Sequence, residues 1–129
     1  MNDTVNTRVK EALNRTEIMA LSTVGEDGSW ISPVRFSYTY KLELSFMSMP
    51  DTKHVQNILR YPRVSVAIYS FPGPPGGNVG LQVKGTARLV DGEDGDGWQH
   101  FTITPSEVWL FDSRITRERQ RVDLSDLAL

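Results

Sequence analysis

The sequence predicts a mainly β protein, a small antiparallel β-barrel with a few short helices, in a single domain over residues 1–129. Three observations predict this fold class. About six short segments have strand-like patterns, and in most of them apolar residues alternate with polar ones, as in strands with one buried face. Turn-forming residues separate several of these segments, and only two segments have helical spacing. About six short antiparallel strands with one connecting helix favour a barrel.

The chain begins with a predicted helix and a hairpin. Residues 4–13 place their apolar side chains on one stripe, which predicts an N-terminal helix within residues 1–16. Residues 18–24 form a short apolar run and predict the first strand. The turn sequence Gly25-Glu-Asp-Gly28 follows it. The alternating segment from Trp30 to Tyr38 then predicts the second strand.

Four later segments predict the rest of the sheet. Residues 41–47, 64–68 and 79–89 alternate, and residues 98–110 give one or two last strands. Gly85 predicts a bend or bulge that lets the sheet curl. The residues expected to face the core are Leu42, Leu44, Phe46, Val64, Val66, Ile68, Val79, Leu81, Val83, Ala87 and Leu89.

A short helix with a chemically distinctive start is predicted after residue 51. Its expected buried face consists of Val55, Ile58 and Leu59, and Pro62 ends the helix. Thr52 would cap the N-terminus. The free N–H groups of the first turn, the Thr52 hydroxyl and the ammonium of Lys53 would then suit a phosphate. The alternative is an ordinary N-cap followed by a solvated lysine.

Two other segments carry candidate binding chemistry. In Ser32-Pro-Val-Arg-Phe-Ser37 the proline removes one ladder N–H, so main-chain groups of this strand become available to a planar ligand. The alternative is an edge strand with a surface arginine. Near the C-terminus, Trp109 and Phe111 precede several arginines, which suits phosphate clamping or an interface anchor. The alternative is a basic tail beside core aromatics.

Composition excludes several classes of protein. Fourteen Lys and Arg against 16 Asp and Glu give a net charge of −2, so no overall field attracts nucleic acid. We find no apolar run of the ~18–20 residues that a membrane span needs, and no signal peptide at the N-terminus. The chain has no cysteine, which excludes disulfides and thiolate catalysis. We therefore expect a cytoplasmic protein without nucleic-acid or membrane partners.

No metal site or hydrolase motif is expected. The acidic loop Asp91–Asp96 lacks the spacing of a calcium loop. The two histidines, His54 and His100, share no helical or strand register, which argues against zinc or haem ligation. A histidine in the first turn of a helix is also commonly a surface residue. Phosphate-loop, Rossmann and nucleophile-elbow patterns are absent from the sequence.

Taken together, three stretches resemble the pyridoxamine 5'-phosphate oxidase-like, FMN-binding split-barrel superfamily over residues 18–121. The stretches are Ser32-Pro-Val-Arg-Phe-Ser37 with Phe46-Met-Ser48, Asp51-Thr-Lys-His-Val-Gln-Asn-Ile58 with Tyr61-Pro-Arg-Val-Ser65, and Leu81-Gln-Val-Lys-Gly-Thr-Ala87. The resemblance implies a homodimer of six-stranded antiparallel split β-barrels with two FMN sites at the subunit interface. It also implies that residues 109–129 lie at that interface.

The resemblance further implies which residues contact FMN. Strand 32–37 would lie along the isoalloxazine ring, residues 52–54 would bind the phosphate, and an arginine would come from the partner subunit. The implied FMN contacts are Ser32, Pro33, Val34, Arg35, Phe36, Met47, Ser48, Thr52, Lys53, His54, Gln82, Phe111 and Arg121. The implied substrate-side residues are Tyr38, Arg117 and Arg119.

Several positions depart from the oxidase itself. Residues 52–54 match a Ser-Arg-Lys motif that binds the FMN phosphate, and His54 is a departure from it. Arg119 replaces a histidine that contacts the substrate, and Ser37 replaces a lysine used for the substrate phosphate. The segment after Val90 is too short for the helices that complete the oxidase's substrate site. The resemblance therefore implies an FMN-dependent oxidoreductase acting on an unidentified small molecule, not a true pyridoxamine phosphate oxidase. The alternatives are a deazaflavin-dependent reductase and a non-catalytic flavin- or haem-binding stress or storage protein.

Overall fold

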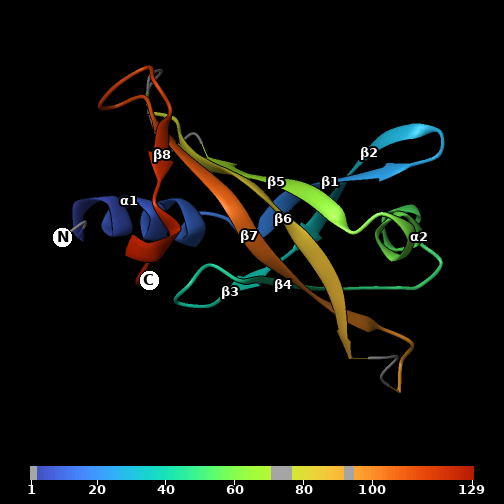
Figure 1. Cartoon of the computed structure of the whole chain (residues 1–129). Helices are drawn as coiled ribbons and strands as arrows, with labels where there is room; N and C mark the ends of the chain where they lie inside the picture. Colours follow the sequence, from blue (N-terminus) through green and yellow to red (C-terminus); the bar gives the residue numbers. More distant parts are fainter. Residues whose placement is uncertain (1–2, 71–76, 92–94) are drawn as a thin grey trace.

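A single curled antiparallel sheet dominates the computed structural model, which describes residues 3–70, 77–91 and 95–129 (Figure 1). The mainly β fold class is therefore confirmed. The helices are α1 (Asp3–Asn14), α2 (Lys53–Arg60) and the 3-10 helix η1 (Leu124–Asp126). The strands are β1 (Ile18–Gly25), β2 (Gly28–Arg35), β3 (Ser37–Tyr38), β4 (Leu44–Ser48), β5 (Arg63–Ser70), β6 (Val79–Asp91), β7 (Gln99–Asp112) and β8 (Gln120–Val122). None of the described helices is long and apolar enough to span a membrane.

The sheet is closed by one chain segment that pairs at both of its ends. The strand order is β2-β1-β5-β6-β7-β4-β3, with β8 added beside β7. β2 and β3 are separated only by Phe36, so residues 28–38 pair with β1 first and with β4 afterwards. Counted this way, the barrel described here has the six antiparallel strands that the sequence predicts. The β3–β4 ladder stops at the Ser37–Ser45 pair, and the barrel is split between β2 and the rest of β4.

The core lies inside this curled sheet and confirms most of the predicted inward positions. Leu59 and Leu89 are exceptions, because their side chains are 53% and 41% exposed. Leu59 is exposed because α2 turns His54, Val55, Asn57 and Ile58 toward the barrel instead. The two polar members of this face have partners, since Asn57 Nδ2 donates to Thr23 Oγ1 at 3.0 Å and His54 Nε2 lies 2.7 Å from Ser48 Oγ. The inward-facing positions that are buried as predicted are Leu42, Leu44, Phe46, Val64, Val66, Ile68, Val79, Leu81, Val83 and Ala87.

Gly85 marks the predicted irregularity of the sheet. The register of β6 against β7 shifts between Lys84 and Gly85. A Cβ at position 85 would lie 2.5 Å from the carbonyl oxygen of Thr104 and 2.8 Å from Cγ2 of Ile103. Only glycine allows the two strands to approach this closely, so the predicted bulge is confirmed.

The two ends of the chain meet at the side of the barrel away from α2 (Figure 1). There α1 lies beside β8 and η1, neither of which the sequence pattern predicted. The buried carboxylate of Asp112, at the end of β7, accepts hydrogen bonds from Arg8 at 3.3 Å and from Arg114 at 2.8 Å. Arg114 also donates to Glu11 at 2.6 Å, so α1 is tied to the β7 terminus by ion pairs.

Candidate functional site

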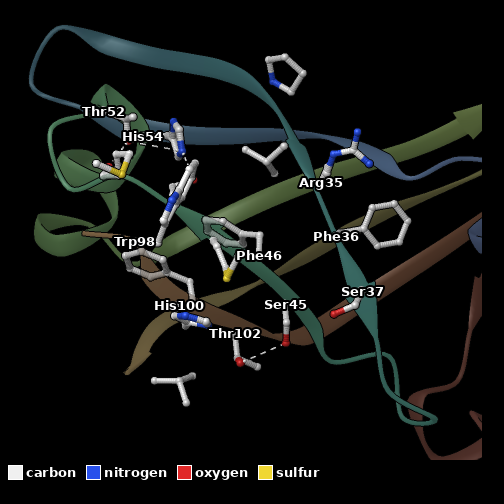
Figure 2. Close-up of a pocket in the computed structure, with 17 residues that line it drawn as sticks. Arg35, Phe36, Ser37, Ser45, Phe46, Thr52, His54, Trp98, His100 and Thr102 are labelled. Atoms are coloured by element: carbon white, nitrogen blue, oxygen red, sulfur yellow. Dashed lines mark hydrogen bonds between the residues drawn. The ribbon is translucent and has the colours of Figure 1, made fainter. Parts of the chain in front are cut away.

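A cavity of about 750 Å³ opens in the split between β2 and β4. Figure 2 shows the side chains that line it, which come from β2, β3, β4, the start of α2, the end of β6, the facing part of β7 and the segments between them. Eight of the residues that the sequence assigned to a cofactor line this cavity. They are Pro33, Val34, Arg35, Phe36, Met47, Ser48, Thr52 and His54.

One end of the cavity is formed by the N-terminus of α2. Thr52 is the N-cap, as predicted: its Oγ1 accepts a hydrogen bond from the amide of Val55 and donates to the carbonyl oxygen of Met49 at 2.9 Å. The amide of Gln56 donates to the carbonyl of Thr52. The remaining two amides of the first turn, those of Lys53 and His54, find no acceptor among the described residues. This corner therefore offers two N–H donors at the positive end of a helix, a set that suits an anionic group.

His54 is buried at this same corner instead of lying on the surface. Its Nε2 is 2.7 Å from Ser48 Oγ and 3.5 Å from Thr52 Oγ1. Burial lowers the pKa of His54 below its ordinary value of 6.5. The imidazole is therefore neutral at pH 7, and Nε2 can either donate to or accept from a hydroxyl, depending on its tautomer.

Aromatic rings form the floor of the cavity. The rings of Phe46 and Phe101 are stacked with centroids 5.2 Å apart and planes 12° from parallel. In Figure 2 the labelled side chains of Phe46, Trp98 and His100 gather on one side of the cavity, and Phe36 lies on β2's side. A planar, mostly apolar ligand suits such walls.

Sequence reasoning missed Trp98 and His100 as site residues. They reach the cavity because β7 pairs with β4, which places His100 directly opposite Met47. The separate sequence patterns of the two segments do not contain this pairing. The signal that could have found His100 is the strand register, which depends on contacts between distant parts of the chain. Both histidines of the chain therefore line one cavity.

Other predicted residues lie outside the cavity. The ammonium of Lys53 is 2.8 Å from Asp27 Oδ2 and 4.7 Å from the centre of the Trp30 ring. Ser32 is buried in β2, opposite Leu21 of β1. Arg35 does line the cavity, but its guanidinium pairs with Glu17 at 2.8 Å and the side chain is 78% exposed.

The C-terminal residues form a second cluster, on the outer face of β6 and β7. Arg119 Nε donates to Gln82 Oε1 at 2.7 Å, and its guanidinium stacks over Phe111 at 5.6 Å. Arg121 stacks over Trp109 at 5.7 Å. No member of this cluster lines the cavity in the split.

The two remaining substrate-side residues lie apart from the cavity too. The hydroxyl of Tyr38 donates to Asn14 Oδ1 at 2.6 Å, so it fastens β3 to α1. Arg117 is exposed in the segment between β7 and β8. No group of three metal-ligating side chains occurs among the described residues, which do not include residues 92–94 of the acidic loop.

The sequence matches the family model of pyridoxamine 5'-phosphate oxidase over residues 5–121. The chain belongs to this family. Among curated proteins no match is found. The resemblance stated from the sequence is therefore confirmed at the level of the pyridoxamine 5'-phosphate oxidase family.

Solved structures share the fold of this family member at low sequence identity. A putative pyridoxamine 5'-phosphate oxidase from Listeria innocua is 19% identical with a TM-score of 0.69, over 83% of this chain and 98% of that one. A heme binding protein from Mycobacterium smegmatis is 14% identical with a TM-score of 0.79, over 97% of this chain and 60% of that one. The heme storage protein HutZ from Vibrio cholerae is 15% identical with a TM-score of 0.65, over 80% and 90%. At these identities the likeness shows the fold alone.

Proposed function

We propose that this chain binds FMN in the cavity between β2 and β4 and acts as an FMN-dependent oxidoreductase on a small molecule. The observation that carries the proposal is the cavity's combination of aromatic walls with two N–H donors at the start of α2 that find no acceptor in the part of the chain that the structure describes. The donor set fits a phosphate monoester, and the aromatic side fits a flat tricyclic ring. When bound, FMN would supply the hydride or electron transfer.

The residues of this chain would hold the cofactor in three ways. The amides of Lys53 and His54, with the Thr52 hydroxyl, would bind the phosphate. Strand residues 33–36 would lie against the ring and offer main-chain groups, since β2 pairs with no strand on its cavity side. Phe46 would exclude water from the opposite side.

We propose further that two copies of the chain assemble around the cofactors. Gln82, Phe111 and Arg121 do not line the cavity of their own chain, and a second copy could present them to it. The outer face of the sheet also has a hollow of about 500 Å³ whose lining includes Ile31, which is 65% exposed, and Trp109. Exposed apolar side chains around a hollow are typical of an interaction surface. Sedimentation equilibrium tests this step, because a stable monomer would contradict it.

A haem-binding role is the second candidate, because both histidines line the same cavity. A neutral imidazole is the form that ligates iron, and burial keeps His54 neutral. The deazaflavin alternative has less support. Its longer acidic tail would need a basic groove, and of the nearby cations Lys53 pairs with Asp27 while Arg60 pairs with Glu26.

Absorption spectroscopy of the purified protein, before and after addition of FMN or haemin, separates these candidates. FMN binding predicts oxidised-flavin bands, quenched flavin fluorescence and one FMN per chain. A Soret band that disappears in His54→Ala or His100→Ala would favour haem instead.

A matched pair of variants places the ligand. Ser45→Trp should fill the cavity and abolish binding, because Ser45 lines it next to Thr102. Thr104→Trp adds the same ring farther along the same face of β7, at an exposed position that does not line the cavity, and should bind normally. Loss of binding in both variants, or in neither, would remove the cavity from the proposal. Oxidation of reduced nicotinamides by the FMN-loaded protein, with a panel of acceptors, then tests the redox activity.

A further inference from the structure

Lys53 is held away from the cavity by the β1–β2 hairpin. It is the first residue of α2, between Thr52 and His54, which both line the cavity, yet its own side chain does not. The ammonium is 2.8 Å from Asp27 Oδ2 and lies over the ring of Trp30 at 4.7 Å. The side chain thus has two partners on the hairpin and none in the cavity.

The hairpin does not depend on Lys53 for its position. Asn57 donates to the buried hydroxyl of Thr23 at 3.0 Å, and Arg60 pairs with Glu26 at 2.6 Å. The backbone at Gly25 packs so closely on α2 that a Cβ there would lie 2.5 Å from Asn57 Oδ1. These contacts would keep the Asp27 carboxylate near the start of α2 even if Lys53 changed partner.

The pair between Lys53 and Asp27 is weak enough to exchange. The two side chains are 42% and 70% exposed, so water screens their attraction. The hydrogen bond from Lys53 lowers the pKa of Asp27, so the carboxylate remains charged at neutral pH. The lysine side chain has a flexible four-carbon stem, so its ammonium can move between anions that lie near its backbone.

We propose that Asp27 is a specificity-determining residue, a competing anion that a ligand's phosphate must displace from Lys53. This inference rests on the proposed function, because it assumes a phosphate at the first turn of α2. Asp27 then lowers the affinity for FMN, while riboflavin, which has the same ring and no phosphate, does not require the exchange. Asp27, which lies on the hairpin outside the cavity, would thereby reduce the selectivity for FMN over riboflavin.

Fluorescence-quenching titrations with FMN and riboflavin test the proposal in the full-length protein. In Asp27→Asn we expect FMN to bind about 2- to 5-fold tighter, the range expected when an exposed ion pair no longer has to be broken. Riboflavin affinity should stay within twofold of wild type. Lys53→Met should weaken FMN binding, and adding Asp27→Asn to it should change nothing further.

Glu26→Gln is the matched control, because it removes a neighbouring ion pair of the same hairpin without touching Lys53. It should leave the ratio of FMN to riboflavin affinity unchanged, and thermal unfolding should verify that every variant is folded. The proposal is overturned if Asp27→Asn leaves FMN affinity unchanged, tightens riboflavin equally, or acts in the Lys53→Met background. Wild-type protein that binds neither flavin would instead refute the proposed function, and this inference with it.

Discussion

Replacing Asp112 with asparagine should destabilise the protein measurably while leaving its shape intact. The carboxylate is fully buried and accepts hydrogen bonds from the side chain and amide of Arg114 and from Arg8. These bonds hold α1 against the end of β7 and shape the turn that leads toward β8. Asparagine keeps the size of the side chain but loses the charge that both guanidiniums share.

The magnitude follows from the pKa of Asp112, which its hydrogen bonds with Arg114 lower from 3.8 to about 2. A pKa lowered from 3.8 to about 2 corresponds to at most about 2.4 kcal/mol. Arg114 is 37% exposed, so solvent screens part of the attraction, and we expect a loss of about 1–2 kcal/mol in the free energy of unfolding. Urea titration monitored by circular dichroism measures this difference at pH 7.

The difference in unfolding free energy between wild type and Asp112→Asn should depend on pH in one direction. A carboxylate with a lowered pKa in the folded state stabilises the protein above its unfolded pKa and loses that contribution as pH falls through the folded value. The difference between wild type and Asp112→Asn should therefore be constant above about pH 5 and shrink between pH 4 and pH 2. Glu118→Gln, an exposed carboxylate between β7 and β8, is the control and should have no effect. A difference under about 0.5 kcal/mol at pH 7, or one that persists at pH 2, would refute the reasoning.

Two further measurements test the packing and the site. Gly80→Ala should cost about 1–3 kcal/mol of unfolding free energy in urea, because its Cβ would lie 2.5 Å from the carbonyl oxygen of Ile68 and 2.4 Å from Phe111 Cζ; an unaffected midpoint would contradict this close packing. The imidazole protons of His54 should titrate in NMR with a midpoint below 6.5, since burial lowers its pKa. As pH falls below 6.5, the imidazole is protonated in the unfolded state before it is protonated in the folded state. The free energy of unfolding should therefore decrease in wild type, and decrease less in His54→Gln. A titration midpoint at 6.5 would contradict the burial of His54.

Local sequence patterns predicted the strands that have one buried face and the bulge that a glycine marks. The alternation of Val64, Val66 and Ile68 follows from one buried sheet face, which requires no knowledge of the neighbouring strand. The bulge at Gly85 was predictable because glycine in a strand interior has few other roles. β8 was missed, since Gln120–Val122 is short and gains its ladder only from pairing with β7.

Only the part of the candidate site that depends on the local sequence of a single segment was predictable. Thr52 is a cap by local chemistry, and it lies where the sequence placed it. The direction of the Lys53 side chain depends on Asp27 in another element, and the burial of His54 depends on Ser48 across the preceding loop. His100 enters the cavity through the register of β4 against β7. Each of these facts is a tertiary contact, and helical or strand periodicity contains no information about it.

The location of the cavity follows from how the barrel closes. Residues 28–35 pair with β1, whereas residues 37–38 pair with β4, so the chain changes partner at Phe36. The amide of Phe36 still donates to Glu17, on the β1 side, at 3.1 Å. β4 runs on from Ser45 to Ser48 against β7 alone, which leaves its other edge facing β2 across a gap.

Such a gap leaves backbone polar groups that must be satisfied by water or by a ligand, because buried N–H and C=O groups seldom remain unpaired. α2 begins directly after β4, so its N-terminus necessarily lies at one end of the gap. An extended polar edge, an aromatic floor and a helix N-terminus are thus brought together by the same change of strand partner. A barrel that closed fully at Phe36 would keep every strand of this chain and lose the site.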